Sequence, residues 1–140
     1  MAVVGTAAST QVTLYPSTGV SGATTATLNA HDVMLVTTSA GNTNLTGTRV
    51  EADKPVAVFG GNACTNVPYG MSYCDHVEQQ IFPRQAIGSY YVVGKLAART
   101  TCNPPDYIRV MADADGTVVT FSPAVAGPWT LNAGQWQEAS

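Results

Sequence analysis

Seven residues between positions 64 and 80 carry most of the side chains that could do chemistry in this sequence. They are Cys64, Cys74, Asp75, His76, Glu78, Gln79 and Gln80. Two thiols can join in a disulfide or, with an imidazole, bind zinc. A thiol near a glutamine can form an internal thioester, and a histidine between carboxylates can act as a general base. The residue types alone leave these chemistries open.

A zinc site would need a third sulfur ligand from farther along the chain. Cys64, Cys74, His76 and Cys102 make a Cys₃His set, which zinc accepts tetrahedrally. The spacing C-x₉-C-x-H is unlike the close cysteine pairs of structural zinc sites, so we expect no metal and no other cofactor. A thioester between Cys74 and one of the two glutamines is a further alternative, which a disulfide at Cys74 would exclude.

Catalysis by His76 would also need a nucleophile in a recognisable setting. Asp75 and Glu78 could orient the imidazole as a general base. The stretch Gly70–Cys74 reads GMSYC, however, and lacks the second glycine of a nucleophile elbow. We therefore expect that the protein is not an enzyme.

Composition narrows the class of protein further. The 140 residues suffice for one domain with a sizeable core, and 45% of them are hydrophobic. Charged residues make up only 11%, against about 25% in average soluble domains, so neutral polar side chains must cover the surface. The net charge of −3 disfavours nucleic acid and anionic membranes as partners, and no apolar run is long enough to insert into a bilayer. Residues 1–4 lack the features of a signal peptide, so we expect Met1 to be an initiator joined to a segment of a longer chain.

Alternating apolar residues and turn signals predict an all-β chain. In Thr10–Tyr15, Val12 and Leu14 fall on one face at the period of two that a strand requires. Further strands are expected at 32–38, 46–51, 55–60, 89–96, 107–112, 117–122, 129–131 and 135–138. Asp113–Gly116 and Asn132–Gly134 predict hairpin turns, although the oxygens of the first are also of the kind that Ca²⁺ binds. We expect an antiparallel β-sandwich.

The end of the chain repeats the pattern of its beginning. The pattern Val3-Val4-x₅-TQVTLYP, ending at Pro16, is similar to Val110-Met111-x₅-TVVTFSP, ending at Pro123. The tetrapeptide Thr-Leu-Asn-Ala occurs at 27–30 and again at 130–133. We expect residues 1–140 to form a single β-sandwich domain in which 3–109 are one repeat unit. Residues 110–140 are then either the start of a second unit in a tandem array or pseudo-symmetric closing hairpins.

The segment from 45 to 99 resembles the IgGFc-binding protein N-terminal domain family, in particular its bacterial extracellular members. The resemblance is carried by LTGT at 45–48, KPVAVFG at 54–60, Cys64, Val67-Pro68, Cys74-Asp75-His76, Glu78-Gln79, Pro83, Gly88 and YVV at 91–93. Ile87 stands where the family usually has tryptophan, and Cys102 is outside its pattern. The resemblance implies a secreted or cell-surface β module, without implying that this member binds immunoglobulin.

In such a module we expect a disulfide between Cys64 and Cys74, with a turn at Gly70 between them. Cys102 is then a free thiol, a partner for a second chain, or a competitor for one of the other two cysteines. Asp75, His76, Glu78 and Gln79 are expected either to anchor this loop by hydrogen bonds or to bind a partner.

The expected function is that of a non-enzymatic extracellular structural or adhesion module. Its partners would be other protein chains, including copies of itself that join strand edges into homo-oligomers or filaments. The alternative is a protein- or glycan-binding module that uses the Cys64–Cys74 loop.

Overall fold

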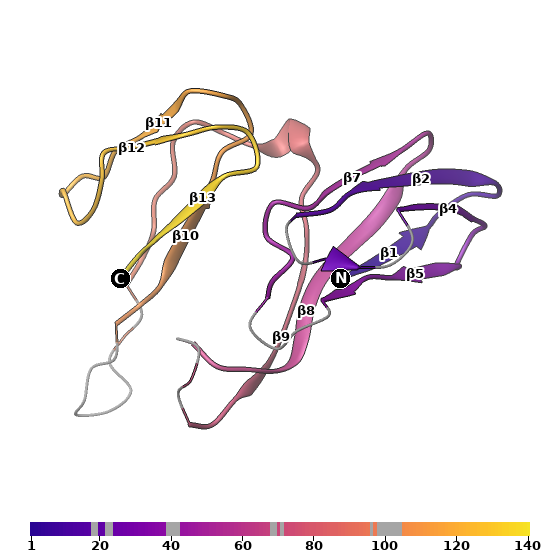
Figure 1. Cartoon of the computed structure of the whole chain (residues 1–140), viewed down its shortest axis with the longest axis horizontal. Coiled ribbons are helices and arrows are strands. Elements are labelled where there is room, and N and C mark those ends of the chain that lie inside the picture. Colours follow the sequence, from indigo (N-terminus) through magenta and orange to yellow (C-terminus); the bar gives the residue numbers. More distant parts are fainter. Residues whose placement is uncertain are drawn as a thin grey trace. The chain divides into compact units, whose positions relative to one another are not determined.

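The computed structural model describes residues 1–17, 20–21, 24–38, 43–67, 70, 72–95, 97 and 105–140. They form two compact units, Met1–Phe82 and Pro83–Ser140. Figure 1 colours the chain along its sequence and labels the longer strands. The boundary at 82/83 differs from the repeat boundary expected at 109/110, which stays a prediction.

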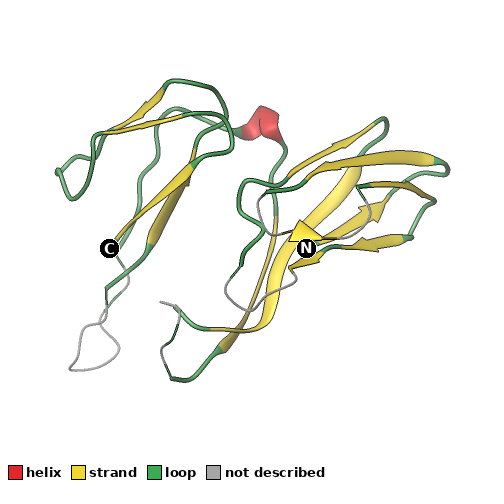
Figure 2. Ribbon diagram, viewed as in Figure 1, coloured by secondary structure: helices red, strands yellow, loops and turns green. Residues whose placement is uncertain are grey.

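The prediction of an all-β chain is confirmed. Among the described residues, every regular element is a β-strand except one 3₁₀ turn, η1 (Arg84–Ala86), drawn red in Figure 2. No helix in this described part is long and apolar enough to cross a lipid bilayer. The strands pair antiparallel throughout.

The described residues of the first unit form two sheets and a short strand pair. The larger sheet contains, in spatial order, β5 (Val33–Leu35), β1 (Ala2–Gly5), β8 (Val56–Thr65) and β9 (Asp75–Gln80). The smaller sheet contains β4 (Thr25–Leu28), β2 (Thr10–Tyr15) and β7 (Arg49–Ala52). The strand pair joins β3 (Val20–Ser21) to β6 (Thr37–Thr38).

The core of the first unit lies between its two sheets, as the predicted sandwich requires. Val12 and Leu14 of β2 alternate with exposed or half-buried residues and pack in one cluster with Val3 of β1, Leu28 of β4 and Val36. Burying one such side chain contributes roughly 1.5–3 kcal/mol. The period-two pattern read from Thr10–Tyr15 therefore identifies the core face of β2 correctly.

Besides η1, the described residues of the second unit form two separate strand pairs. β10 (Ile108–Met111) pairs with β13 (Trp136–Ala139), and β11 (Thr117–Val119) pairs with β12 (Trp129–Leu131). The expected hairpins at 113–116 and 132–134 are therefore wrong, because the strands that flank each turn belong to different sheets. Gly116 and Gly134 do adopt the positive φ of a chain reversal, +69° and +79°. Turn chemistry fixes the reversal of the chain and leaves the pairing partner open.

The strand expected at 89–96 is also wrong over its described residues, 89–95, which belong to no strand. Tyr90 and Val92 are each 84% exposed. Strand propensity measures how well a side chain packs on a neighbouring strand, and among the described residues none pairs with this segment. Leu96 lies outside the described residues.

Candidate functional site

β9 is an edge strand that presents the whole of the predicted site to solvent. It pairs only with β8 among the described strands, and all six of its residues are exposed. The pairing sets Gly60 opposite Gln79 and Gly61 opposite Glu78. A β carbon at Gly61 would lie 2.9 Å from the carbonyl oxygen of Val77, so glycine is what lets the two backbones approach this closely here.

The register of the large sheet divides the predicted site residues between two faces. Val3 lies opposite Val58 and Met34, and these three residues belong to the core cluster or pack against it. Ala2 lies opposite Leu35 and Phe59, so these side chains point to the other, outer face of the sheet.

Phe59 is opposite Gln80 in β9. Because side chains alternate along a strand, His76 and Glu78 share the outer face with Gln80. Asp75 and Gln79 point to the core-side face, where they remain exposed. The structure thus brings His76 and Glu78 together and separates them from Asp75 and Gln79.

The outer face combines a polar pair with exposed aliphatic side chains. His76 Nε2 lies 3.4 Å from Glu78 Oε2, and both side chains are mostly exposed, so this pair adds little to stability. Val33 and Leu35 of β5 are 57% and 72% exposed. An open depression of about 260 Å³ lies on the sheet, with Leu35, Phe59, His76 and Glu78 among its lining residues. We call this surface the outer face.

Sequence reasoning missed the apolar half of the outer face. Leu35 and Phe59 lie 17 or more positions from His76 in the sequence, and only the β5-β1-β8-β9 order brings them to one surface. The alternation of Val33 and Leu35 within 32–38 was a usable signal for a shared face. This alternation did not indicate which face of the strand packs against the core.

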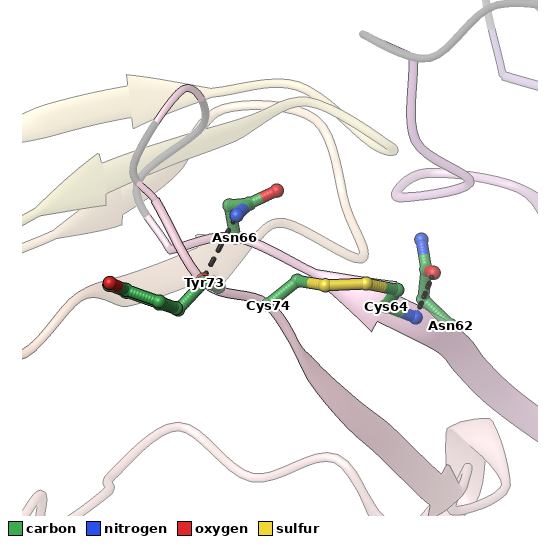
Figure 3. The surroundings of a disulfide bond; sticks show 5 residues. All are labelled: Asn62, Cys64, Asn66, Tyr73 and Cys74. Atoms are coloured by element: carbon green, nitrogen blue, oxygen red, sulfur yellow. Dashed lines mark hydrogen bonds between the residues drawn. A yellow bond between two sulfur atoms is a disulfide. The ribbon is translucent and has the colours of Figure 1, made fainter.

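A disulfide fixes the end of the β8–β9 hairpin beside this surface. Cys64 in β8 and Cys74 just before β9 are joined, with their Cα atoms 4.9 Å apart. In Figure 3 the side-chain oxygen of Asn62 accepts a hydrogen bond from the Cys64 N–H (2.9 Å). The Asn66 amide donates to the Tyr73 carbonyl (3.0 Å), and the tyrosine ring points away from the disulfide. These bonds hold a stretch in which the register shifts between Asn62 and Thr65.

The disulfide excludes two of the alternative chemistries, the zinc site and the thioester. Zinc binding and a thioester both need the sulfur atoms that Cys64 and Cys74 use in their bond. Within the described ranges, no three His, Cys, Asp or Glu side chains gather into a metal-binding group. Cys102 lies outside the described residues, so the roles expected for it stay predictions.

The carboxylates of the 113–116 turn have protein partners that account for them. Asp113 forms an ion pair with Arg84 at 2.7 Å. Asp115 Oδ1 accepts a hydrogen bond from the Ala133 N–H at 2.9 Å. These contacts link the turn to its own unit, which favours the structural role over the calcium-binding alternative.

Comparison with known proteins gives one family over the whole chain. The model of the family described as "IgGFc binding protein" matches residues 1–140. The chain is also similar to the human protein named "IgGFc-binding protein", with 39% identity over 57 residues. That match covers 41% of this chain and 1% of the human protein, so the chain spans only a small part of the relative's length. No solved structure matches the chain. With its family model matched from the first residue to the last, this all-β chain belongs to the IgGFc-binding protein family.

Proposed function

We propose that this chain is a non-enzymatic extracellular module that binds a protein partner through the outer face of the β5-β1-β8-β9 sheet. The observation that carries the proposal is the union of exposed Leu35 and Val33 with the His76–Glu78 pair on one sheet surface. Apolar side chains surrounded by hydrogen-bonding groups are the usual make-up of a protein-binding patch.

Two further observations support an extracellular protein partner. The Cys64–Cys74 disulfide persists in an oxidising compartment, which agrees with a secreted or cell-surface location. The name of the human relative says that it binds the Fc region of IgG, a folded extracellular protein. The Fc fragment is therefore the first partner that we propose for this surface.

The mechanism of binding follows from the rigidity of the surface. The disulfide and the asparagine hydrogen bonds hold the start of β9 in place before any partner arrives. A surface that is ordered in advance loses less conformational entropy on binding than a mobile loop does. His76 and Glu78 then supply a donor and an acceptor beside the aliphatic contact of Leu35.

The test compares two sets of substitutions on the same strand. The outer-face variant carries His76→Ala, Glu78→Ala and Leu35→Ser, and the matched control carries Asp75→Ala and Gln79→Ala on the core-side face. Each is titrated against purified Fc fragment by surface plasmon resonance, and its thermal unfolding is recorded in parallel. We expect the outer-face variant to lose at least about tenfold in affinity, as expected when contact residues are removed. The control should bind like the wild type.

Equal binding by the two variants, or loss only in the Asp75/Gln79 control, would contradict the outer face as the recognition surface. Loss of affinity together with a lowered melting temperature would assign these residues to loop anchoring instead. Failure of the wild type to bind Fc would remove Fc as the partner.

The open edge of β9 favours a second candidate function, a structural or adhesion module that self-assembles. The strand offers unpaired backbone groups on one side among the described residues. Its sequence, DHVEQQ, contains neither proline nor lysine, the residues that commonly protect edges. We propose that copies of the chain can join here by strand addition. Sedimentation velocity over rising concentration tests this, and a monomer at every concentration would contradict it.

A further inference from the structure

The two ends of the described chain share one pattern of strand pairing. In the first unit β1 pairs with β5 and β2 pairs with β4. In the second unit β10 pairs with β13 and β11 pairs with β12. The registers also correspond under the sequence repeat, because Val3 opposite Met34 becomes Val110 opposite Gln137, and Thr10 opposite Leu28 becomes Thr117 opposite Leu131.

The connections between these strands carry matching backbone hydrogen bonds. The N–H of His31 donates to the Gly5 carbonyl at 2.9 Å, and the N–H of Gly134 donates to the Ala112 carbonyl at the same distance. His31 and Gly134, which correspond in the repeat, have φ of +72° and +79°. A residue other than glycine with positive φ is uncommon, so the agreement of His31 with Gly134 supports a shared backbone geometry at this position.

Side-chain hydrogen bonds match in the same way. Thr10 Oγ1 donates to the Ala7 carbonyl at 2.8 Å, and Thr117 Oγ1 donates to the Ala114 carbonyl at 2.7 Å. Asn29 Oδ1 accepts from the N–H of residue 9 at 3.1 Å, while Asn132 Oδ1 accepts from the N–H of residue 116 at 3.2 Å. The two segments therefore fold by the same local rules.

Two strands of the second unit, β10 and β11, lack the second partner that their counterparts β1 and β2 have, among the described residues. In the first unit β1 also pairs with β8, and β2 also pairs with β7. Within the described residues of the second unit, β10 and β11 each have one partner. The burial of corresponding side chains reflects this difference, because β7 and β8 help to enclose those of the first unit. Val3 and Val12 are 0% and 1% exposed, whereas their counterparts Val110 and Val119 are only half-buried.

We propose that the open edges of β10 and β11 are the docking site for two strands with the chemistry of β8 and β7, supplied by another repeat unit. The strand like β8 would add to β10, and the strand like β7 would add to β11. In this account residues 110–140 begin a second repeat, and the docked strands complete its two sheets. The register of the first unit predicts the contacts. Met111 should lie opposite the counterpart of Ala57, because its own counterpart Val4 does so, and Val119 should lie opposite the counterpart of Ala52.

The chemistry of the occupant follows from what β7 and β8 contribute to the first unit. Val50, Val56 and Val58 pack against the core from these strands. The occupant is therefore an extended segment with small aliphatic side chains on one face, which covers Val110 and Val119 and donates backbone hydrogen bonds to both edges. This inference rests on the internal repeat and is independent of the outer-face proposal.

The test supplies the occupant from the chain's own sequence. Ser140 corresponds to Thr37 in the repeat, so a copy of residues 38–82 is appended directly after Ser140. Hydrogen exchange is then compared with that of the unmodified chain. Gly5 N–H donates to Asp32 in the direction of β5, so in β1 the alternate N–H groups of Ala2 and Val4 point to β8. The counterpart of Val4 is Met111.

We expect the amide of Met111 to exchange at least about 100-fold more slowly in the extended chain. A matched control carries Val50→Asp, Val56→Asp and Val58→Asp in the appended copy only. It should leave the Met111 amide exchanging as fast as in the unmodified chain. Unchanged exchange in the extended chain, or equal protection by the control, would overturn the proposal.

A cross-link tests the register separately. Met111→Cys is combined with Ala57→Cys in the appended copy, and Cys102→Ser removes a competing thiol. Opposed residues of neighbouring strands lie within the Cα separation that a disulfide needs. We expect this pair to oxidise, and a pair shifted by one residue, with Val56→Cys in the copy, to stay reduced because its side chain faces away. Oxidation of the shifted pair alone, or of neither pair, would contradict the proposed docking.

Discussion

Removal of the Cys64–Cys74 disulfide should cost the protein about 3 kcal/mol of unfolding free energy. The two cysteines are 10 positions apart. The chain-entropy relation for a closed loop of that length gives about 3 kcal/mol at 25 °C. The perturbation is the double variant Cys64→Ser/Cys74→Ser, compared with the oxidised chain, both with Cys102→Ser so that no other thiol can interfere.

Urea denaturation followed by far-ultraviolet circular dichroism measures this free energy. The midpoint should fall, and the slope against urea should stay equal or rise slightly, because the unfolded chain without the cross-link exposes more surface. The oxidised protein under reducing agent should reproduce the double variant. A loss of unfolding free energy below about 0.5 kcal/mol would refute the reasoning. It would mean that the β8–β9 pairing keeps the loop closed without the disulfide.

Three further predictions test core packing, a buried hydrogen bond and a close approach of two backbones. Val12→Ala, at a fully enclosed position, should lower the unfolding free energy by roughly 2–3 kcal/mol, and its half-buried counterpart Val119→Ala by less than about 1 kcal/mol; equal losses would contradict the incomplete second unit. Thr10→Val removes a buried donor to a backbone carbonyl and should cost about 1–3 kcal/mol by thermal or urea unfolding, whereas an unchanged midpoint would show that this hydrogen bond is dispensable. Gly61→Ala brings a β carbon against the Val77 carbonyl, so it should speed hydrogen exchange in β9, and unaltered exchange there would argue against close approach of the two backbones.

The elements that the sequence predicted best are those whose pattern depends on their own residues. The alternation in Thr10–Tyr15 identifies both a strand and its buried face, since the period of two is a local property. The positive φ of Gly116 is likewise local. The expected strand at 89–96 is wrong over 89–95 because strand formation needs a partner, and Tyr90 to Val93 carry no information about one.

The candidate site could be predicted only in part for a related reason. The residues of β9 are consecutive in the sequence. Composition alone therefore marks a run that contains His76 and Glu78 as a candidate site. Their separation from Asp75 and Gln79 follows from strand alternation once β9 is known to be a strand. Leu35 joins the same surface only through the order β5-β1-β8-β9, which depends on long-range pairing. Local periodicity does not determine the order of strands in a sheet.

The most direct test of the proposed function is the binding of Fc fragment to three forms of the chain on one sensor surface. The wild type and the Asp75→Ala/Gln79→Ala control should bind with affinities that agree within about twofold, well under the roughly 1 kcal/mol that marks a contact residue. The His76→Ala/Glu78→Ala/Leu35→Ser variant should bind at least about tenfold more weakly at an unchanged melting temperature. Binding by this last variant as tight as that of the wild type would contradict the outer face as the recognition surface.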